Sequence, residues 1–258
     1  MLDSAPQYPV PSRFERCLDL IFPPLCVECR RVGRWICTRC WTTISWLSDA
    51  RCGVCGSPSG CTPCPRCADR SSSITSVLAV AAFEGVAREA VHALKYEGKH
   101  AVAPMMGRLM ARAAYELGAN LVVATPLHAA RRRERGYDQA ALLARAIARE
   151  LQLSSDVTRL KRVRRTKQQV RLVPEERRRN VSGAFQATRP LHGETVLLVD
   201  DVYTTGATID AAAAALLEGG AGSVLGVVFG YAEFGQDAGG PKSNRGNFTA
   251  SRPNRSTR

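Results

Sequence analysis

The sequence has 258 residues, of which 45% are hydrophobic, and it carries a formal charge of +13. That length has room for one α/β domain and a smaller module, with enough apolar residues for a core. No stretch approaches the roughly eighteen apolar residues of a membrane span, and the N-terminus lacks a signal-peptide pattern, so we expect a cytoplasmic protein. The excess of basic residues favours polyanionic partners, either phosphorylated substrates or nucleic acid.

The N-terminal quarter of the chain is rich in cysteine. After a proline-containing arm over residues 1–24, nine of the ten cysteines lie between Cys26 and Cys67, in C-x-x-C spacing that is typical of metal sites rather than disulfides. Two such pairs complete one tetrahedral Zn²⁺ site, so a module over residues 25–68 is predicted to hold two structural zinc ions. The predicted ligands are Cys26, Cys29, Cys37, Cys40, Cys52, Cys55, Cys64 and Cys67.

The sequence leaves two features of this zinc module undecided. Cys64 can pair with Cys61 or with Cys67, and we choose Cys67 because it leaves more room after Cys55. The pairs can also combine consecutively or in a cross-braced manner, and we favour consecutive pairs as in a double zinc ribbon. An all-cysteine set with no open position indicates structural rather than catalytic zinc.

A serine-rich linker over residues 68–76 precedes a predicted second domain over residues 77–231. Residues 77–83 are strand-like, and a short helix, a turn at Gly98 and a longer helix are predicted to follow. Lys95 lies at the end of the first helix, where a cation complements the helix dipole, although a single lysine is usually only solvated.

The apolar segment LVVAT, which starts at Leu121, predicts a second buried parallel strand. In open α/β sheets, residues after the carboxyl end of a strand line the ligand crevice. Arginine suits phosphate and pyrophosphate oxygens because its guanidinium group can donate two parallel hydrogen bonds, and a solvated basic face is the alternative. Gly136 then provides a turn before a helix over residues 137–151. The candidate anion-binding residues here are Pro126, Leu127, His128, Arg131, Arg132, Arg133 and Arg135.

Residues 159–179 contain ten basic and two acidic residues. Two hypotheses fit this strip: a mobile hood that closes over a bound ligand, and a surface that binds nucleic acid with salt-sensitive affinity. The strip contains no aromatic residue for stacking on bases, which disfavours a single-strand platform.

The central motif of the predicted second domain is the segment TVLLVDDVYTTGATID, from Thr195 to Asp210. A buried strand over residues 196–199 is expected to end at Asp200 and Asp201, and a helix to about Glu218 is expected to follow. The helix N-terminus, its backbone N–H groups and the threonine hydroxyls make an anion site, and the acids can accept hydrogen bonds from sugar hydroxyls or help to hold hydrated Mg²⁺. The alternative is a plain capped helix with solvated acids. The candidate phosphate-binding residues are Thr204, Thr205, Gly206, Ala207 and Thr208.

A last parallel strand is predicted over residues 223–229, followed by a disordered basic tail over residues 232–258. The fold class expected from these elements is α/β, with an open, mainly parallel sheet flanked by helices.

The segment from Thr195 to Asp210 resembles the phosphoribosyl pyrophosphate (PRPP) signature of type I phosphoribosyltransferases. This resemblance implies that Asp200 and Asp201 meet the ribose hydroxyls, that the T-T-G-x-T turn holds the 5′-phosphate, and that the region from Pro126 to Arg135 meets pyrophosphate.

Further motifs extend the resemblance to the ComF family of competence-associated, phosphoribosyltransferase-like proteins over about residues 25–231. They are the cysteine pairs, HALKY, RERGYDQ and TKQQVRL…RRRNVSGAF, in this order. The family usually has asparagine at the position of Asp138, so this chain has an added negative charge beside the expected anion site. The resemblance implies Mg²⁺-PRPP as ligand and phosphoribosyl transfer to an unknown acceptor, or alternatively a non-catalytic protein that binds a nucleotide or single-stranded DNA in DNA uptake.

Overall fold

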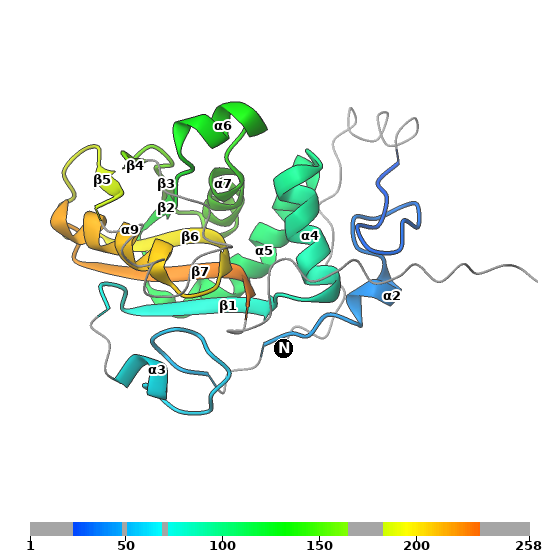
Figure 1. Ribbon diagram of the computed structural model, residues 1–258, viewed down its shortest axis with the longest axis horizontal. Helices are drawn as coiled ribbons and strands as arrows, with labels where there is room; N and C mark the ends of the chain where they lie inside the picture. The colour runs from blue at the N-terminus through cyan, green and yellow to red at the C-terminus, as the bar shows by residue number, and fades with distance from the viewer. Residues whose placement is uncertain (1–22, 48–50, 69–71, 165–182, 233–258) are drawn as a thin grey trace, which may run out of the picture.

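An open parallel sheet forms the centre of the molecule (Figure 1). The computed structural model describes residues 23–47, 51–68, 72–164 and 183–232. Within these ranges all neighbouring strands of the main sheet pair in parallel, in the order β1-β7-β6-β2-β3. The strands are β1 Ser76–Ala82, β2 Leu121–Ala124, β3 Ser154–Ser155, β6 Thr195–Tyr203 and β7 Ser223–Tyr231.

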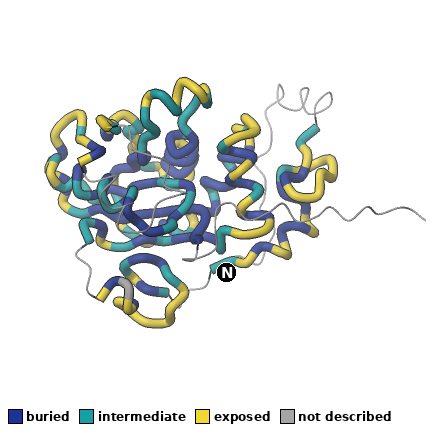
Figure 2. Tube along the Cα trace, in the orientation of Figure 1, coloured by how far each residue is buried: buried dark blue, intermediate teal, exposed yellow. Residues whose placement is uncertain are grey.

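Helices cover both faces of this sheet, which confirms the predicted α/β class. Leu197 and Val199 of β6 pack with one set of helices, whereas Val196 and Leu198 pack with α9 on the other face, because successive side chains of a strand point to opposite sides. The two layers explain why the central strands are almost entirely buried (Figure 2). On the first face lie α4 Gly85–Tyr96, α5 Ala103–Ala114 and α7 Gln139–Leu151; on the second lies α9 Ala207–Glu218.

Smaller elements complete the described fold. A separate antiparallel pair flanks the sheet, and short helices lie in the cysteine-rich region and after β2. These elements are α2 Thr38–Trp41, α3 Pro65–Ala68, η1 His100–Val102, η2 Tyr115–Leu117, α6 Ala129–Arg135, β4 Leu160–Arg162 and β5 Phe185–Ala187.

Strand β6 is longer than the sequence predicted, so the expectation that it ends at the two acids is wrong. On one side, pairing with β2 does stop at Val199. On the other side β7 continues to Tyr231, and the register pairs Asp200 with Val228 and Tyr203 with Tyr231. The longer neighbour therefore supplies backbone partners beyond the acids.

Two further boundaries differ from the expected ones. The arginines after β2 lie on the short helix α6, which the sequence analysis did not predict. Helix α7 begins at Gln139 rather than at residue 137, because the side chain of Asp138 caps it by accepting hydrogen bonds from backbone N–H groups. The arm up to residue 22, residues 165–182 with most of the basic strip, and the tail from residue 233 lie outside the described residues.

Gly107 of α5 packs closely against α7. A Cβ atom added there would lie 2.5 Å from the Cβ of Ala146. We therefore expect Gly107→Ala to lower the free energy of unfolding by about 1–3 kcal/mol, since the two helices must separate. Urea denaturation measures this change, and an unaltered midpoint would show that the helix pair adapts without cost.

Candidate functional site

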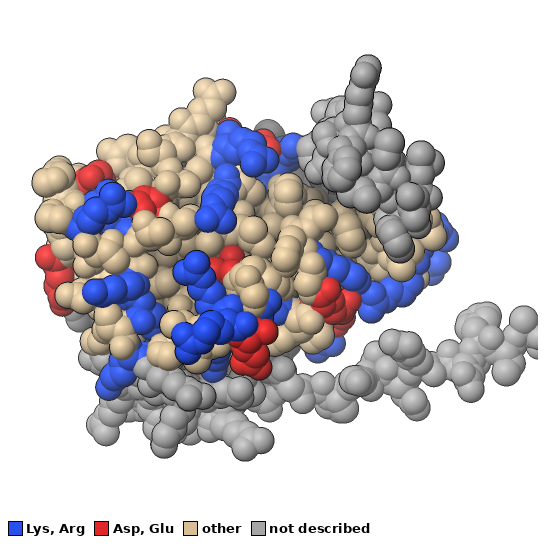
Figure 3. All heavy atoms as spheres, turned by 90° about the horizontal axis from the view of Figure 1, so that it is seen from above, with Lys and Arg blue, Asp and Glu red and all other residues tan. Residues whose placement is uncertain are grey.

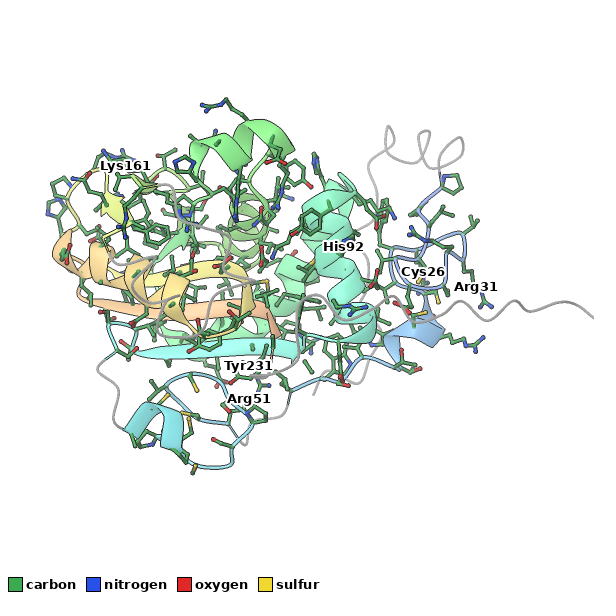
Figure 4. The ribbon with its side chains drawn as sticks, viewed as in Figure 1. Cys26, Arg31, Arg51, His92, Lys161 and Tyr231 are labelled. Atoms are coloured by element: carbon green, nitrogen blue, oxygen red, sulfur yellow. The ribbon has the colours of Figure 1, made fainter. Side chains whose placement is uncertain are left out.

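The acid pair, Asp200 and Asp201, lies where β6 extends past the end of β2. Asp201 is 3% exposed, and its backbone N–H donates to Oδ1 of Asp200 over 2.9 Å. Tyr231, labelled in Figure 4, marks the same carboxyl edge of the sheet on the neighbouring strand. The edge of the sheet at which open α/β folds bind ligands thus carries two adjacent carboxylates.

Two side chains from different helices hold Asp201. Nζ of Lys95, near the end of α4, lies 2.5 Å from one carboxylate oxygen, and Nε2 of Gln139 donates to the other over 2.8 Å. Lys95 thus interacts with the acid pair instead of being only solvated. Both oxygens of a buried carboxylate are thereby satisfied, as a buried charge requires.

The carboxyl group of Asp200 has a raised pKa. Burial, with a contribution from the neighbouring Asp201, raises the pKa of Asp200 to about 8, although Lys95 acts in the opposite direction. Asp200 therefore keeps its proton to a higher pH than an ordinary aspartate, and its protonated form can donate a hydrogen bond.

Asp138 connects the loop after β2 to α7. Its Oδ2 accepts a hydrogen bond from the Leu127 N–H over 2.8 Å, while its Oδ1 accepts from the N–H groups of Ala140 and Ala141. Burial raises the pKa of Asp138, and the charge of Asp201 adds to this, while these backbone donors lower it. Asp138 thus joins the loop after β2 to the start of α7.

The turn between β6 and α9 ends at a glycine that starts the helix. Gly206 caps α9 with a left-handed φ of 76°, and a side chain there would overlap the ring of Tyr203. The ring of Tyr203 stacks on that of Tyr231, with 5.6 Å between centroids. The hydroxyl of Thr205 accepts from the Ala207 N–H over 3.4 Å, whereas Thr204 and Thr208 are partly exposed.

The arginines of α6 are divided between two surroundings. Arg135 donates to Oε1 of Gln139, and its guanidinium group lies 5.1 Å from the ring centre of Tyr96. Burial and the positive charge of Arg131 lower the pKa of Arg162 on β4, whereas the negative charge of Asp200 raises it. His128 caps α6 by accepting from the Ala130 N–H. Figure 3, seen from the α6 side, shows basic side chains spread over this face with acidic ones between them.

The cysteines predicted as zinc ligands gather into two groups of four, with the sulfur atoms of each group within 4.8 Å of one another. Zn–S bonds of about 2.3 Å in a tetrahedron require sulfur separations of about 3.8 Å. The observed separations of 3.5 Å for Cys29–Cys37 and 3.7 Å for Cys55–Cys64 fit this requirement. The groups are Cys26, Cys29, Cys37 and Cys40, and Cys52, Cys55, Cys64 and Cys67.

The grouping joins consecutive pairs and leaves the exposed Cys61 outside. The two groups do not form one compact module. The first packs beside α4, as Cys26 and His92 show in Figure 4, whereas the second lies against β1 and belongs to the core on the other face of the sheet.

Comparison with known proteins agrees with this architecture. The double zinc ribbon domain matches residues 17–70, and the phosphoribosyl transferase domain matches residues 138–232. The DNA utilization protein YhgH of Salmonella typhi is 32% identical over 218 residues, which are 80% of this chain and 96% of that protein. The YhgH protein of Escherichia coli O157:H7 is 31% identical with the same coverage. Competence protein F of Haemophilus influenzae is 26% identical over 201 residues, 72% of this chain and 87% of that protein. The chain belongs to the ComF family.

Sequence reasoning missed one residue at the acid pair of this ComF chain. Gln139 ends the RERGYDQ motif and contacts both Asp201 and Arg135, yet of that motif only the arginines were proposed as site residues. Its place at the end of that motif was the available signal. Within the described ranges of the ComF chain, no helix is long and apolar enough to cross a lipid bilayer.

Proposed function

We propose that this ComF-family protein binds Mg²⁺-PRPP at the acid pair and transfers its phosphoribosyl group to an acceptor. The observation that carries the proposal is the fixed carboxylate of Asp201, held by Lys95 and Gln139 next to the glycine-capped start of α9. A sugar-hydroxyl acceptor and a phosphate-binding helix N-terminus then lie on one strand–turn–helix unit.

Each part of the ligand has a proposed partner. Asp200 and Asp201 take the ribose hydroxyls, and the turn from Thr204 to Thr208 takes the 5′-phosphate. The pyrophosphate end faces the loop and helix after β2, where the proposed residues are Pro126, Leu127, His128, Arg131 and Arg135, with Lys95 opposite. The acids and the ligand oxygens suit Mg²⁺, which when bound neutralises charge on the pyrophosphate.

In the proposed reaction a nitrogen nucleophile forms a bond to the anomeric carbon while the bond from that carbon to the pyrophosphate oxygen breaks. The configuration inverts, and pyrophosphate leaves with the bonding electron pair. Positive charge develops on the sugar ring and negative charge on the leaving group, so fixed arginines near the pyrophosphate contribute more than a general base does.

Calorimetric titration of Mg²⁺-PRPP into the zinc-loaded protein tests the proposal. We expect micromolar binding by the wild type and no detectable binding by the Asp200→Asn, Asp201→Asn double variant. Asp156→Asn is the matched control, since Asp156 pairs with Arg159 and Arg189 instead of facing the acid pair. Equal binding by the double variant and the wild type would contradict the proposal.

The words DNA utilization and competence in the names of the relatives favour a second candidate that acts on DNA. We propose it as a non-catalytic protein that binds single-stranded DNA during DNA uptake. In that case neutralising the acid pair leaves DNA affinity unchanged, because the acids face no phosphate. Substitutions of basic residues weaken DNA affinity and reduce its salt dependence. Fluorescence anisotropy with a labelled oligonucleotide separates the two candidates.

A further inference from the structure

An exposed aromatic ring directly follows the lysine that pairs with Asp201. Tyr96 is the last residue of α4 and directly follows Lys95, the partner of Asp201. Its side chain is 66% exposed, so its aromatic surface is open to solvent. A tyrosine ring in water offers an aromatic face on which a planar group can stack.

This ring is held in place from two directions. The guanidinium carbon of Arg135 lies 5.1 Å from the ring centre of Tyr96, within the range of a cation–π contact. The ring of His92, one turn earlier on α4, lies 4.8 Å away and is tilted by 47°. A ring fixed in this way loses little conformational freedom when a ligand stacks on it, which favours binding.

Tyr96 is also connected to the acid pair by a closed circuit of contacts. Arg135 donates to Gln139, Gln139 donates to Asp201, and Asp201 pairs with Lys95, whose backbone leads directly to Tyr96. Tyr96 is therefore linked to the acid pair through Arg135 and Gln139 on one side and through Lys95 on the other. Bases carry planar faces, and their stacking on aromatic and arginine side chains tolerates any base.

We infer that Tyr96 and Arg135 form a stacking site for a nucleobase at the edge of the acid pair. The base has two possible sources, a free base that accepts the phosphoribosyl group or a base within a single strand, and these correspond to the two functions proposed above. The inference of a stacking site does not depend on which of the two functions is correct. It supplies the aromatic surface that the basic strip of residues 159–179 lacks.

The test uses the full zinc-loaded protein and three probes: a twelve-residue thymidine oligonucleotide, an abasic oligonucleotide of equal length, and free adenine with Mg²⁺-PRPP present. We expect Tyr96→Ala to weaken binding of the thymidine oligonucleotide, or of adenine, about tenfold or more. Tyr96→Phe should restore binding, because the ring and not the hydroxyl stacks. The abasic oligonucleotide should bind both variants like the wild type.

Tyr115 provides the matched control, since it is 76% exposed and follows α5 toward the amino end of β2, away from the acid pair. Tyr115→Ala should bind every probe like the wild type. A loss confined to the oligonucleotide assigns the base to a single strand, and a loss confined to adenine assigns it to a free acceptor. Unchanged binding of both by Tyr96→Ala, equal loss on the abasic oligonucleotide, or a wild type that binds neither base-containing probe overturns the inference.

The outcome of this test can be told apart from the outcome of the test of the proposed function. Mg²⁺-PRPP alone should bind Tyr96→Ala like the wild type, whereas the acid-pair double variant should lose PRPP and keep the thymidine oligonucleotide if the base lies in a single strand. Failure of PRPP to bind would therefore contradict the proposed reaction while leaving the oligonucleotide result to decide the stacking site.

Discussion

Serine in place of Cys40 or Cys64 is expected to remove one of the two zinc ions and to lower the thermal unfolding midpoint by about 10 °C or more. Cys40 is buried in the core beneath α4 and α5, and Cys64 in the core that includes Val77 of β1. Loss of either metal therefore loosens packing of the sheet domain as well as the local loop. Elemental analysis counts the zinc, and scanning calorimetry measures the midpoint.

Cys61→Ser is the matched control, because Cys61 is exposed and lies outside both sulfur groups. It should retain two zinc ions and the wild-type midpoint. Loss of zinc from Cys61→Ser, or full zinc retention by Cys64→Ser, would show that the third and fourth pairs combine differently. A single variant that lost both ions would show that the two sites fold as one unit.

The zinc ligands could be predicted because C-x-x-C spacing is a local property of the chain. The placement of the two sites could not, since it depends on which apolar side chains each loop buries. Ile36 and Trp41 join the core under α4, whereas the second group joins Ile74 and Val77 on the other face. The predicted domain boundaries near residues 24, 68 and 231 stay predictions.

The strands of the sheet were predictable because they too follow from a local pattern in the sequence. Fully buried parallel strands give continuous β-branched and leucine runs, such as Val196 to Val199. The extension of β6 through Asp200 to Tyr203 was not, because it arises from the length of β7 rather than from the residues of β6. A polar pair ends an apolar run in the sequence without ending the hydrogen bonding of the backbone.

The candidate site was predictable only where it follows a motif. The acids and the T-T-G-x-T turn are contiguous in sequence, and the structure places them in one strand–turn–helix unit. The contacts of Lys95, Gln139 and Tyr96 depend on how α4 and α7 approach the sheet. Long-range packing of this kind leaves no periodic signal in the sequence.

Lys95→Met is expected to lower the affinity for Mg²⁺-PRPP by about 30-fold or more and to make folding more sensitive to alkaline pH. The variant keeps most of the side-chain volume but leaves the carboxyl groups of Asp200, Asp201 and Asp138 without the cation 2.5 Å from Asp201. Titration calorimetry measures the affinity, and urea denaturation at pH 5, 7 and 9 measures the free energy of unfolding.

The direction of the pH effect follows from proton binding. The pKa of Asp200 is raised from 3.8 to about 8 in the folded protein, so the folded state binds more protons than the unfolded state between these values. The stability of the wild type should therefore fall as pH rises from about 4 to about 8. Without Lys95 the pKa of Asp200 rises further, and the decline should extend to higher pH.

Two variants complete the pH experiment. Asp200→Asn cannot ionise, so its stability should change less between pH 5 and 9 than that of the wild type. Lys161→Met removes an exposed lysine from β4 and should follow the wild-type pH profile. If Lys95→Met follows the wild-type profile as closely as Lys161→Met does, the ion pair with Asp201 does not control the charge of the acid pair. Ligand binding at the acids would then have to be explained by the helix terminus and the arginines alone.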